Sequence, residues 1–257
     1  MATLSLKMMP CAQDHKRAFP MDKGLNTGGM GVFALVPGVS QDLLDLIREK
    51  CLVPVLQGMK KRSTTFVGVL FAGIMVTQAG PAVLEFNTRF GDPETQAVLP
   101  LLRTDLMTVI EACLSGNLRS VEIEWAVNLF SVNVVACSEG YPGSYEVGKV
   151  ISGMETVEKN PNVHLFKSAV KEGKTCGGRF LSVTGIALTL EAAAATAYNA
   201  LDCIQFEGKF SRFDIAAKAF TPLKIAVLGS TRGTSLQGIL DAIKRGLFLQ
   251  RARRSIP

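Results

Sequence analysis

Leu84-Glu85-Phe86-Asn87-Thr88-Arg89, followed closely by Gly91-Asp92-Pro93-Glu94, is the stretch that decides the fold of this 257-residue chain. It closes the apolar run 82–86, which follows turn-forming residues at 78–81 and a longer apolar run at 65–76. This order predicts a strand, a hairpin turn and a second strand that ends at a carboxylate. Because side chains of a strand alternate between its faces, we expect Glu85 and Asn87 to share one face and Arg89 to continue that row.

The predicted row combines a carboxylate, an amide oxygen and a guanidinium on one surface. Magnesium prefers oxygen ligands and commonly shares them with substrate phosphates, and the planar fork of an arginine holds phosphoryl oxygens. Groups of this kind position a phosphoryl group for transfer. The alternative is an edge strand whose polar side chains simply meet solvent. The second polar cluster, at 89–96, is too rich in charge for an ordinary connection and favours the functional interpretation.

Helices are predicted on both sides of this hairpin. Apolar residues recur at three- and four-residue spacing over 41–61, with Ser40 in position to cap the helix and Pro54 expected to interrupt it. A second helix is predicted over 105–114, where a capping residue and a glycine stop flank the apolar pattern. The opening segment, up to residue 34, is rich in Gly, Pro and charge, and we interpret it as a functional loop.

The second half of the chain reads as strands followed by one helix. A boundary is expected near 117–122, and an alanine-rich helix over 190–204. Between them, short apolar runs with glycine-rich turns predict strands at 128–137, 148–151, 163–169 and 178–184. Strands followed by a single helix indicate an α+β domain of about 100 residues.

The composition is that of a folded globular protein, with 47% apolar and 19% charged residues. The net charge of +6 does not indicate a nucleic-acid partner, because Arg251, Arg253 and Arg254 supply half of it and the aromatic interleaving of a nucleic-acid module is absent. No apolar run approaches the ~20 residues of a membrane span. Six widely spaced cysteines without a CxxC pair suggest neither a zinc site nor a disulfide framework, and we expect a cytoplasmic protein.

The predicted row of Glu85, Asn87 and Arg89 and several other stretches of the sequence resemble one family. Together they are similar to the end of an ATP-grasp domain, and in particular to glycinamide ribonucleotide synthetase (phosphoribosylamine-glycine ligase), over roughly residues 6–220. The further stretches that carry the resemblance are Gln13-Asp14-His15-Lys16-Arg17, Asn26-Thr27-Gly28-Gly29-Met30-Gly31, 68–75, Leu99-Pro100-Leu101-Leu102, Gly140-Tyr141-Pro142-Gly143, Gly177-Gly178-Arg179 and Arg212-Phe213-Asp214-Ile215-Ala216.

The resemblance implies an α+β fold with three parts. These are the C-terminal half of an ATP-grasp domain (1–120), the small α+β C-terminal domain of the synthetase (121–220), and a truncated Rossmann-like βα unit with an unmatched tail (221–257). It also implies that Glu85 and Asn87 bind Mg2+ (or Mn2+) between the phosphates of ATP, the co-substrate, and that Arg89 steadies those phosphates.

The implied reaction joins glycine to 5-phosphoribosylamine through an acyl phosphate, with release of ADP and phosphate. The remaining implied contacts are with these substrates. In the family the segment Asn26, Thr27, Gly28 and Gly29 lies beside the substrate site, where glycine would let backbone N–H groups approach an anion. A plain turn is the alternative for this segment. Asp14, Lys16 and Asp92 are candidate substrate contacts.

The chain also departs from the family. Members carry a Rossmann-like domain and the first half of the ATP-grasp domain ahead of the position of Gln13, including the lysines that hold ATP. We therefore expect this chain alone to lack ligase activity and to need a separate chain that supplies that half. The end of the strand at 163–169 also differs, and His164 is expected to be a surface strand residue.

The segment 224–243 resembles the beginning of glycinamide ribonucleotide formyltransferase. The resemblance implies that Gly233, Thr234 and Ser235 form a phosphate-binding turn at a helix N-terminus. The formyltransferase's catalytic residues lie beyond residue 257, and the tail at 247–257 fits neither family, so we expect a frameshift or a truncated gene model. Two alternatives remain: a catalytically inactive remnant that persists as a binding module, and a nucleotide-binding oxidoreductase, for which the glycine spacing is incomplete.

Overall fold

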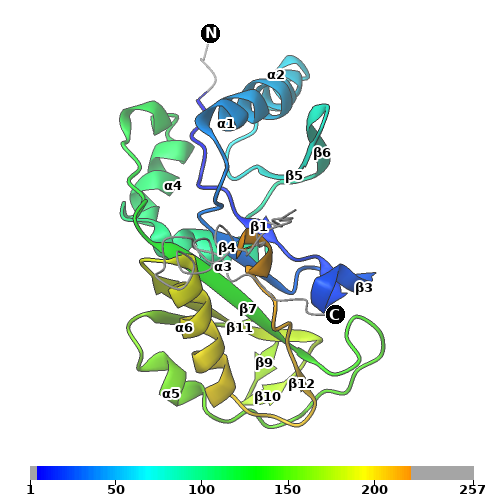
Figure 1. Ribbon diagram of the computed structural model, residues 1–257. Helices are drawn as coiled ribbons and strands as arrows, with labels where there is room; N and C mark the ends of the chain where they lie inside the picture. Colours follow the sequence, from blue (N-terminus) through cyan, green and yellow to red (C-terminus); the bar gives the residue numbers. More distant parts are fainter. Residues whose placement is uncertain (1–4, 221–257) are drawn as a thin grey trace, which may run out of the picture. The chain divides into compact units, whose positions relative to one another are not determined.

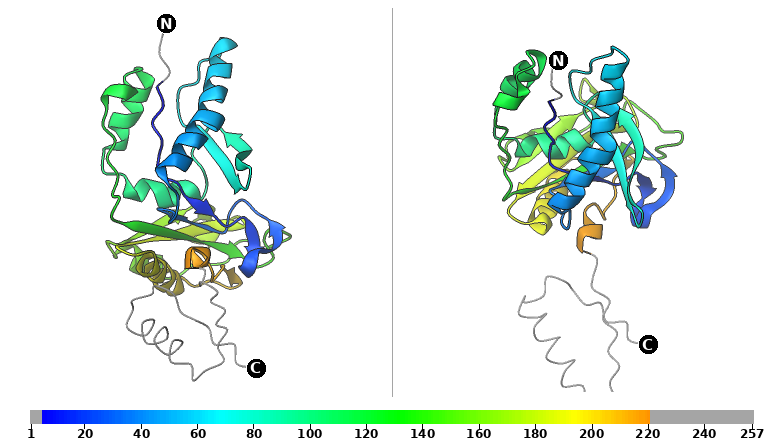
Figure 2. Two further views of the ribbon diagram at one scale, coloured as in Figure 1. Left: turned by 45° about the horizontal axis from the view of Figure 1, so that its top comes forward. Right: turned by 90° about the horizontal axis from the view of Figure 1, so that it is seen from above.

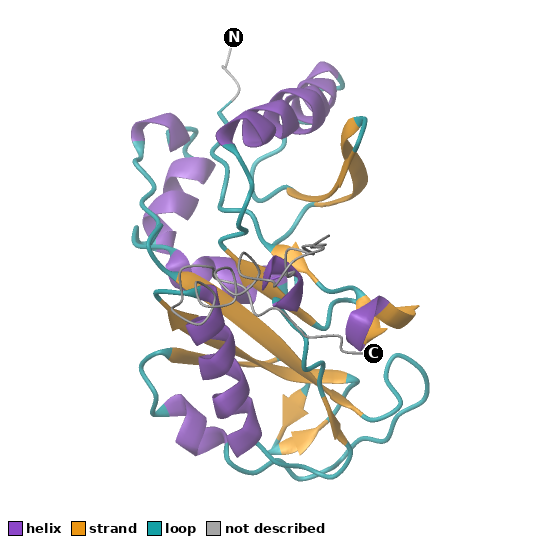
Figure 3. Ribbon diagram, viewed as in Figure 1, coloured by secondary structure: helices purple, strands orange, loops and turns teal. Residues whose placement is uncertain are grey.

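An antiparallel sheet of six strands organises the computed structural model, which describes residues 5–220 (Figures 1 and 3). Its main path runs β1-β4-β7-β11-β8, and β12 pairs with the far end of β7. The strands are β1 (Gln13–Asp14), β4 (Gly31–Ala34), β7 (Phe130–Ser138), β8 (Val163–Lys167), β11 (Arg179–Ala187) and β12 (Lys209–Phe210). The predicted strands at 128–137, 163–169 and 178–184 are thus confirmed as β7, β8 and β11, and His164 is exposed on β8 as expected.

Two helices cover opposite faces of this sheet, as the left view of Figure 2 shows: α3 (Glu94–Val98) and α6 (Leu190–Cys203). On the α3 side, the Thr184 hydroxyl donates to the Gln96 carbonyl oxygen at 2.7 Å, and a buried cluster forms from Val32, Ala34, Ala97, Val98 and Leu101. On the other side, Gly185 lies so close to α6 that no side chain fits between them. Alternation along β7 and β11 therefore gives each helix its own apolar surface.

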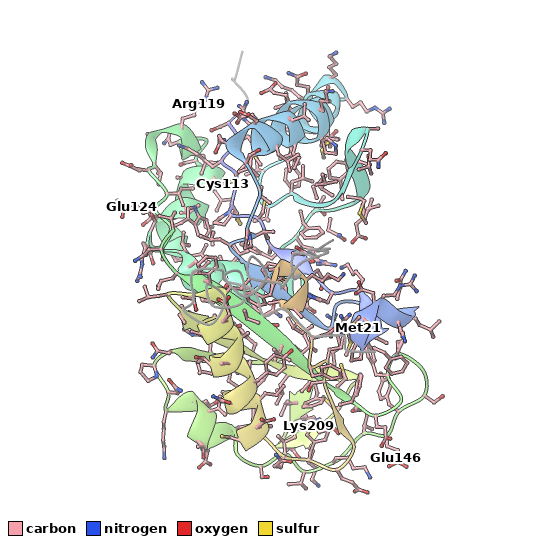
Figure 4. All side chains as sticks on the ribbon, viewed as in Figure 1. Met21, Cys113, Arg119, Glu124, Glu146 and Lys209 are labelled. Carbon is pink, nitrogen blue, oxygen red and sulfur yellow. The ribbon has the colours of Figure 1, made fainter. Side chains whose placement is uncertain are left out.

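Helix α6 begins and ends at residues that satisfy its free backbone groups. The hydroxyl of Thr189 accepts from the Ala192 N–H at 3.1 Å, and the ammonium of Lys209, labelled in Figure 4, donates to the carbonyl oxygens of Leu201 at 3.1 Å and Ile204 at 2.7 Å. Both contacts pair groups that a helix end leaves without an intrahelical partner. The predicted helix 190–204 is confirmed to within one residue.

The predicted hairpin and its helix are also present. Ser40 caps the helix as expected, accepting from the Leu43 N–H at 3.2 Å. The helix runs as α1 (Gln41–Ile47), a π-helical turn (Arg48–Leu52) and α2 (Val53–Lys61), and the hairpin pairs β5 (Phe71–Thr77) with β6 (Gly80–Asn87). Ala72 and Ile74 of β5 pack on a small cluster formed by Ile47, Cys51 and Leu52.

The opening segment differs from the predicted loop. It contains β1, β4 and a second hairpin made of β2 (Arg17–Phe19) and β3 (Lys23–Asn26). All four residues of β4 are buried, so the strand has neither the length nor the alternation that a sequence pattern needs. The region predicted as a strand at 148–151 contributes only an isolated bridge between Val150 and Lys174.

The remaining elements are short apart from α4 (Leu106–Leu114), the helix predicted over 105–114, whose cap is Asp105. They are α5 (Met154–Glu158), the strands β9 (Val170–Lys171) and β10 (Lys174–Thr175), and 3-10 turns at Pro20–Asp22, Leu99–Leu101, Leu118–Ser120 and Ala217–Phe220. None of the helices within residues 5–220 is long and apolar enough to cross a membrane.

Among the described residues, 5–215 belong to one compact unit. Strands β4 and β7, which lie on either side of the boundary predicted near 117–122, pair within this unit. The formyltransferase-like segment, with Gly233, Thr234 and Ser235, and the tail at 247–257 lie outside the described residues.

Candidate active site

Lys16 lies between two poorly exposed carboxylates at one edge of the sheet. Its ammonium is 2.7 Å from Oδ2 of Asp14, the last residue of β1, and 3.7 Å from Oε1 of Glu94, the first residue of α3. The carboxylate side chains are only 9% and 12% exposed, whereas that of Lys16 is 45% exposed. The cluster therefore presents one solvent-accessible cation that is held by two partly desolvated anions.

Burial and mutual repulsion shift the acid–base properties of this cluster. Burial raises the pKa of Asp14 even though Lys16 and Arg179 oppose the shift. The pKa of Glu94 is raised by burial and then by the negative charge of Asp14. For Lys16, burial favours the neutral amine, but the carboxylates of Asp14, Glu94 and Glu85 outweigh it and raise its pKa. The raised pKa of Lys16 therefore reflects chiefly the two carboxylates beside it at the edge of the sheet, those of Asp14 and Glu94.

Glu85 and Asn87 lie on one face of the β5–β6 hairpin, as the sequence predicts. In the register, Glu85 is opposite Gly73 and Asn87 is opposite Phe71, so both point away from the face that packs on α1 and α2. Arg89 differs from the expectation. Strand β6 ends at Asn87, and the Arg89 guanidinium donates to the Phe90 carbonyl oxygen at 2.8 Å instead of extending the row.

The oxygens of Glu85 and Asn87 fit a magnesium ion that takes its other ligands from phosphates and water, which is the usual way proteins hold this ion. Within residues 5–220, no group of three or more His, Cys, Asp and Glu side chains is arranged to hold a metal by itself.

The loop Asn26–Gly29 lies directly against Lys16. The backbone N–H and the hydroxyl of Thr27 donate to the Lys16 carbonyl oxygen at 2.7 and 2.9 Å. The N–H of Gly28 donates to the hydroxyl of Tyr141 at 3.3 Å, and that of Gly29 donates to the hydroxyl of Thr27 at 3.0 Å. These N–H groups thus have partners within the protein, which differs from the expectation that they would face an anion.

Close packing around Gly28 and Gly29, and not an open anion-binding site, explains why these positions are glycine. A Cβ atom on Gly29, whose φ is +119°, would lie 2.4 Å from Cδ of Pro93 and 2.9 Å from Oδ1 of Asp14. A Cβ atom on Gly28 would lie 2.6 Å from Nη2 of Arg179. Glycine lets the loop approach the site's charged side chains.

Asp92 joins this group of residues through Arg179. Its carboxylate accepts from the Gln96 side chain at 2.8 Å and from Nη2 of Arg179 at 3.1 Å. Glu94 and Arg179 are the two members to which sequence reasoning assigned no role. Both lie in stretches named in the sequence analysis, Gly91-Asp92-Pro93-Glu94 and Gly177-Gly178-Arg179. A charged residue directly after a turn is the sequence feature that could have revealed them.

The structure thus brings together Asp14, Lys16, the loop Asn26–Gly29 and Asp92. Arg89 is the predicted site residue that the strand geometry leaves outside the row. Oxygen donors for a cation, a lysine and fixed carboxylates can hold charged ligands through ion pairs and charge-assisted hydrogen bonds.

Comparison with known proteins identifies two domains in the chain. Residues 1–95 match the family model for the phosphoribosylglycinamide synthetase ATP-grasp (A) domain, and residues 131–218 match the model for the phosphoribosylglycinamide synthetase C domain. A phosphoribosylamine–glycine ligase of Caldanaerobacter subterraneus is 45% identical over 211 residues, which are 81% of this chain and 50% of the relative. A trifunctional purine biosynthetic protein adenosine-3 of Bos taurus is 46% identical over 249 residues, 95% of this chain and 24% of the relative.

Solved structures agree with these matches. The crystal structure of phosphoribosylamine–glycine ligase from Thermotoga maritima has a TM-score of 0.68 and 34% identity, covering 81% of this chain and 51% of that one. The biotin carboxylase domain of the Hydrogenobacter thermophilus 2-oxoglutarate carboxylase, with a TM-score of 0.51, 15% identity and coverage of 71% of this chain and 40% of that one, shares the fold alone. The chain spans half or less of the length of the relatives it matches.

Proposed function

The chain belongs to the phosphoribosylglycinamide synthetase family over residues 1–95 and 131–218. We therefore propose that it forms the metal-binding part of the active site of an ATP-dependent ligase. The ligase would join glycine to 5-phosphoribosylamine and give glycinamide ribonucleotide, ADP and phosphate in purine biosynthesis, in the cytoplasm. One observation carries the proposal: the Lys16 ammonium lies 2.7 Å from Asp14 and 3.7 Å from Glu94 at the sheet edge, and the charge of Glu85 on the hairpin contributes to its raised pKa.

In the proposed reaction, the carboxylate of glycine attacks the γ-phosphorus of ATP and displaces ADP, which gives an acyl phosphate. The amine of 5-phosphoribosylamine then attacks the acyl carbon, phosphate leaves and the nitrogen loses a proton. Such a mechanism depends on positioning and charge neutralisation. Mg2+ (or Mn2+), held by Glu85 and Asn87, would neutralise phosphate charge.

The chain's own side chains would hold the substrates in place. Lys16, which is accessible and charged, would face a substrate carboxylate or phosphate, while Asp14 and Asp92 offer carboxylates to an amine. The loop Asn26–Gly29 would form the wall beside the amino acid and the sugar. Arg89 would reach the phosphates from its position beyond β6, because its exposed side chain is not part of a packed surface.

We also propose a polypeptide partner that completes the ATP-binding half of the site. The β5–β6 hairpin is two strands wide in the described part of the chain, and Met75, Val76 and Leu84 on it are 51%, 58% and 65% exposed. A two-stranded hairpin is marginal by itself, and exposed apolar side chains beside unpaired strand edges are typical of contact surfaces.

The test combines this chain with the separately expressed N-terminal half of the Caldanaerobacter ligase. We expect the mixture, with glycine, 5-phosphoribosylamine, ATP and Mg2+, to release phosphate and form product, and either component alone to form none. Glu85→Gln should lower the rate of the mixture by about two orders of magnitude, since losing one charged transition-state contact typically has that effect. Glu111→Gln, an exposed carboxylate on α4, is the matched control and should retain the rate.

Product from the chain alone would contradict the proposed dependence on a partner. A mixture that forms no product, although both components are folded, would favour the alternative of a catalytically inactive remnant. Equal rates for Glu85→Gln and the unmodified chain would remove Glu85 from the metal site.

A further inference from the structure

One guanidinium joins the segments that form the candidate site. Arg179 is the first residue of β11, and its side chain is 21% exposed. Its Nη1 donates to the carbonyl oxygens of Gly28 at 3.1 Å, Gly29 at 3.3 Å and Asp92 at 3.3 Å, while Nη2 donates to Oδ2 of Asp92 at 3.1 Å. These contacts connect positions that are 151, 150 and 87 residues apart in the sequence.

We propose that Arg179 is a positioning residue that holds the loop Asn26–Gly29 and the Asp92 carboxylate in a fixed position relative to each other. In this way it sets the affinity for the amino acid and for the phosphorylated sugar amine. It does not set the affinity for ATP. The proposal rests on the function proposed above. The effect is confined to the small substrates because the hydrogen bonds of Arg179 go to the loop and to Asp92, and none of those that the structure shows goes to Glu85 or Asn87.

The loop depends on this contact because of how its own polar groups are used. The N–H groups of Thr27, Gly28 and Gly29 already donate to Lys16, Tyr141 and Thr27. The carbonyl oxygens of Gly28 and Gly29 point the other way, to the guanidinium. Without it, these two acceptors would need water, and the loop would lose its connection to β11 and to Asp92.

Only a guanidinium matches this set of acceptors. Its planar fork presents five N–H donors in fixed directions, so one side chain can reach two loop carbonyls together with a backbone and a side-chain oxygen of Asp92. A lysine at this position would keep the charge but present a single ammonium point. The charge and the geometry of Arg179 can therefore be separated by substitution.

The test uses Arg179→Lys and Gly28→Ala in the full chain. Gly28→Ala disturbs the same contact from the opposite side, because its Cβ atom would fall 2.6 Å from Nη2 of Arg179. Arg103→Lys, at an exposed position, is the control. We expect hydrogen exchange of the amides at 27–29 to become roughly tenfold faster in both test variants, since hydrogen bonds to charged groups contribute about 1.5–3 kcal/mol and 1.4 kcal/mol corresponds to tenfold. The control should be unchanged.

In the complemented ligase assay, the KM values for glycine and 5-phosphoribosylamine should rise at least about tenfold in the test variants, while the KM for ATP stays within about twofold. Added guanidinium ion should partly restore the Arg179→Gly variant. Unchanged exchange at 27–29 in Arg179→Lys would overturn the proposal. A parallel rise in all three KM values would also overturn it, because it would indicate a general loss of structure. The exchange measurement needs no activity, so failure of the ligase function and failure of the positioning role give different results.

Discussion

The central sheet and the β5–β6 hairpin differ sharply in how much of their apolar side chains is buried by the rest of the described chain. In β7, Val132, Val134 and Ala136 have no exposed surface, whereas Val83 and Leu84 of β6 are 39% and 65% exposed. The sheet has a helix on each face, but the hairpin packs on a single small cluster beside α1 and α2 (Figure 1). The strand with the clearest chemical signal is therefore less well covered by the described chain than the strands of the central sheet.

Polar groups follow the same division. In the sheet region, Arg212 has no exposed side-chain surface, and its guanidinium donates to both carboxylate oxygens of Asp214 at 2.8 Å and to the Arg17 carbonyl oxygen at 2.9 Å. The N–H of Met21, labelled in Figure 4, also donates to Asp214 at 2.8 Å. In the hairpin region, Glu85 is exposed. The fold thus supplies Arg212 and Asp214 with partners, whereas the Glu85 side chain is exposed to a ligand.

The largest expected difference comes from deleting a charge in each region. Arg212→Met should reduce the free energy of unfolding by about 3–5 kcal/mol, because it leaves the poorly exposed Asp214 carboxylate and the Arg17 carbonyl without their partner. Arg89→Met removes the same kind of side chain from an exposed position and should change stability by less than about 0.5 kcal/mol. Urea unfolding of both variants measures the contrast, and similar losses would contradict it.

A smaller difference should follow from adding one methyl group. Gly185→Ala places a Cβ atom 2.4 Å from the Ala193 carbonyl oxygen and 2.5 Å from the Ala197 nitrogen, so α6 must move away from β11. Overpacking of this kind costs about 1–3 kcal/mol. Gly58→Ala, in α2, meets nothing within 4 Å and should stabilise the helix by roughly 0.5–1 kcal/mol. Thermal unfolding gives both values, and a neutral Gly185→Ala would show that the sheet and α6 are not closely packed.

The smallest effect is expected at the junction of the two regions, and it depends on pH. The pKa of Glu94 is raised in the folded protein above its ordinary value of 4.5, by burial and by Asp14. A carboxyl with a raised pKa stabilises the fold at low pH, and this stabilisation is lost as the pH rises from 4.5 through the folded-state pKa. Glu94→Gln should therefore raise the melting temperature at pH 7, by about 2–4 °C for each kcal/mol gained, and have little effect below pH 4.5.

Glu111→Gln is the control for that measurement, because it makes the same substitution at an exposed position on α4, outside the charged cluster around Lys16. A gain from Glu94→Gln that is equally large at acidic pH would show that the carboxylate charge is not its cause.

Elements with a regular pattern were predictable from the sequence alone. The cap at Ser40, the hairpin before Glu85 and the alanine-rich helix each follow from local rules that operate over a few residues. The opening segment was not predictable, because β4 is a four-residue strand that exists only through its pairing with β7, about 100 residues later. The expectation that Arg89 continues the row of Glu85 and Asn87 was also wrong, because strand β6 ends at Asn87. The alternation of side chains along a strand does not reveal where strand pairing stops.

The sequence by itself determined the residue types of the site: Glu85 and Asn87 on one strand face, and a charged loop near Asp14 and Lys16 that resembles a known ligase family. Only the tertiary structure decided which of these residues meet. The ion pair of Lys16 with Glu94, and the contact of Arg179 with Gly28 and Asp92, join segments that are tens to more than a hundred residues apart. Such contacts leave no periodic trace, because their geometry comes from the packing of β1, α3 and β11 and not from the spacing of residues along the chain.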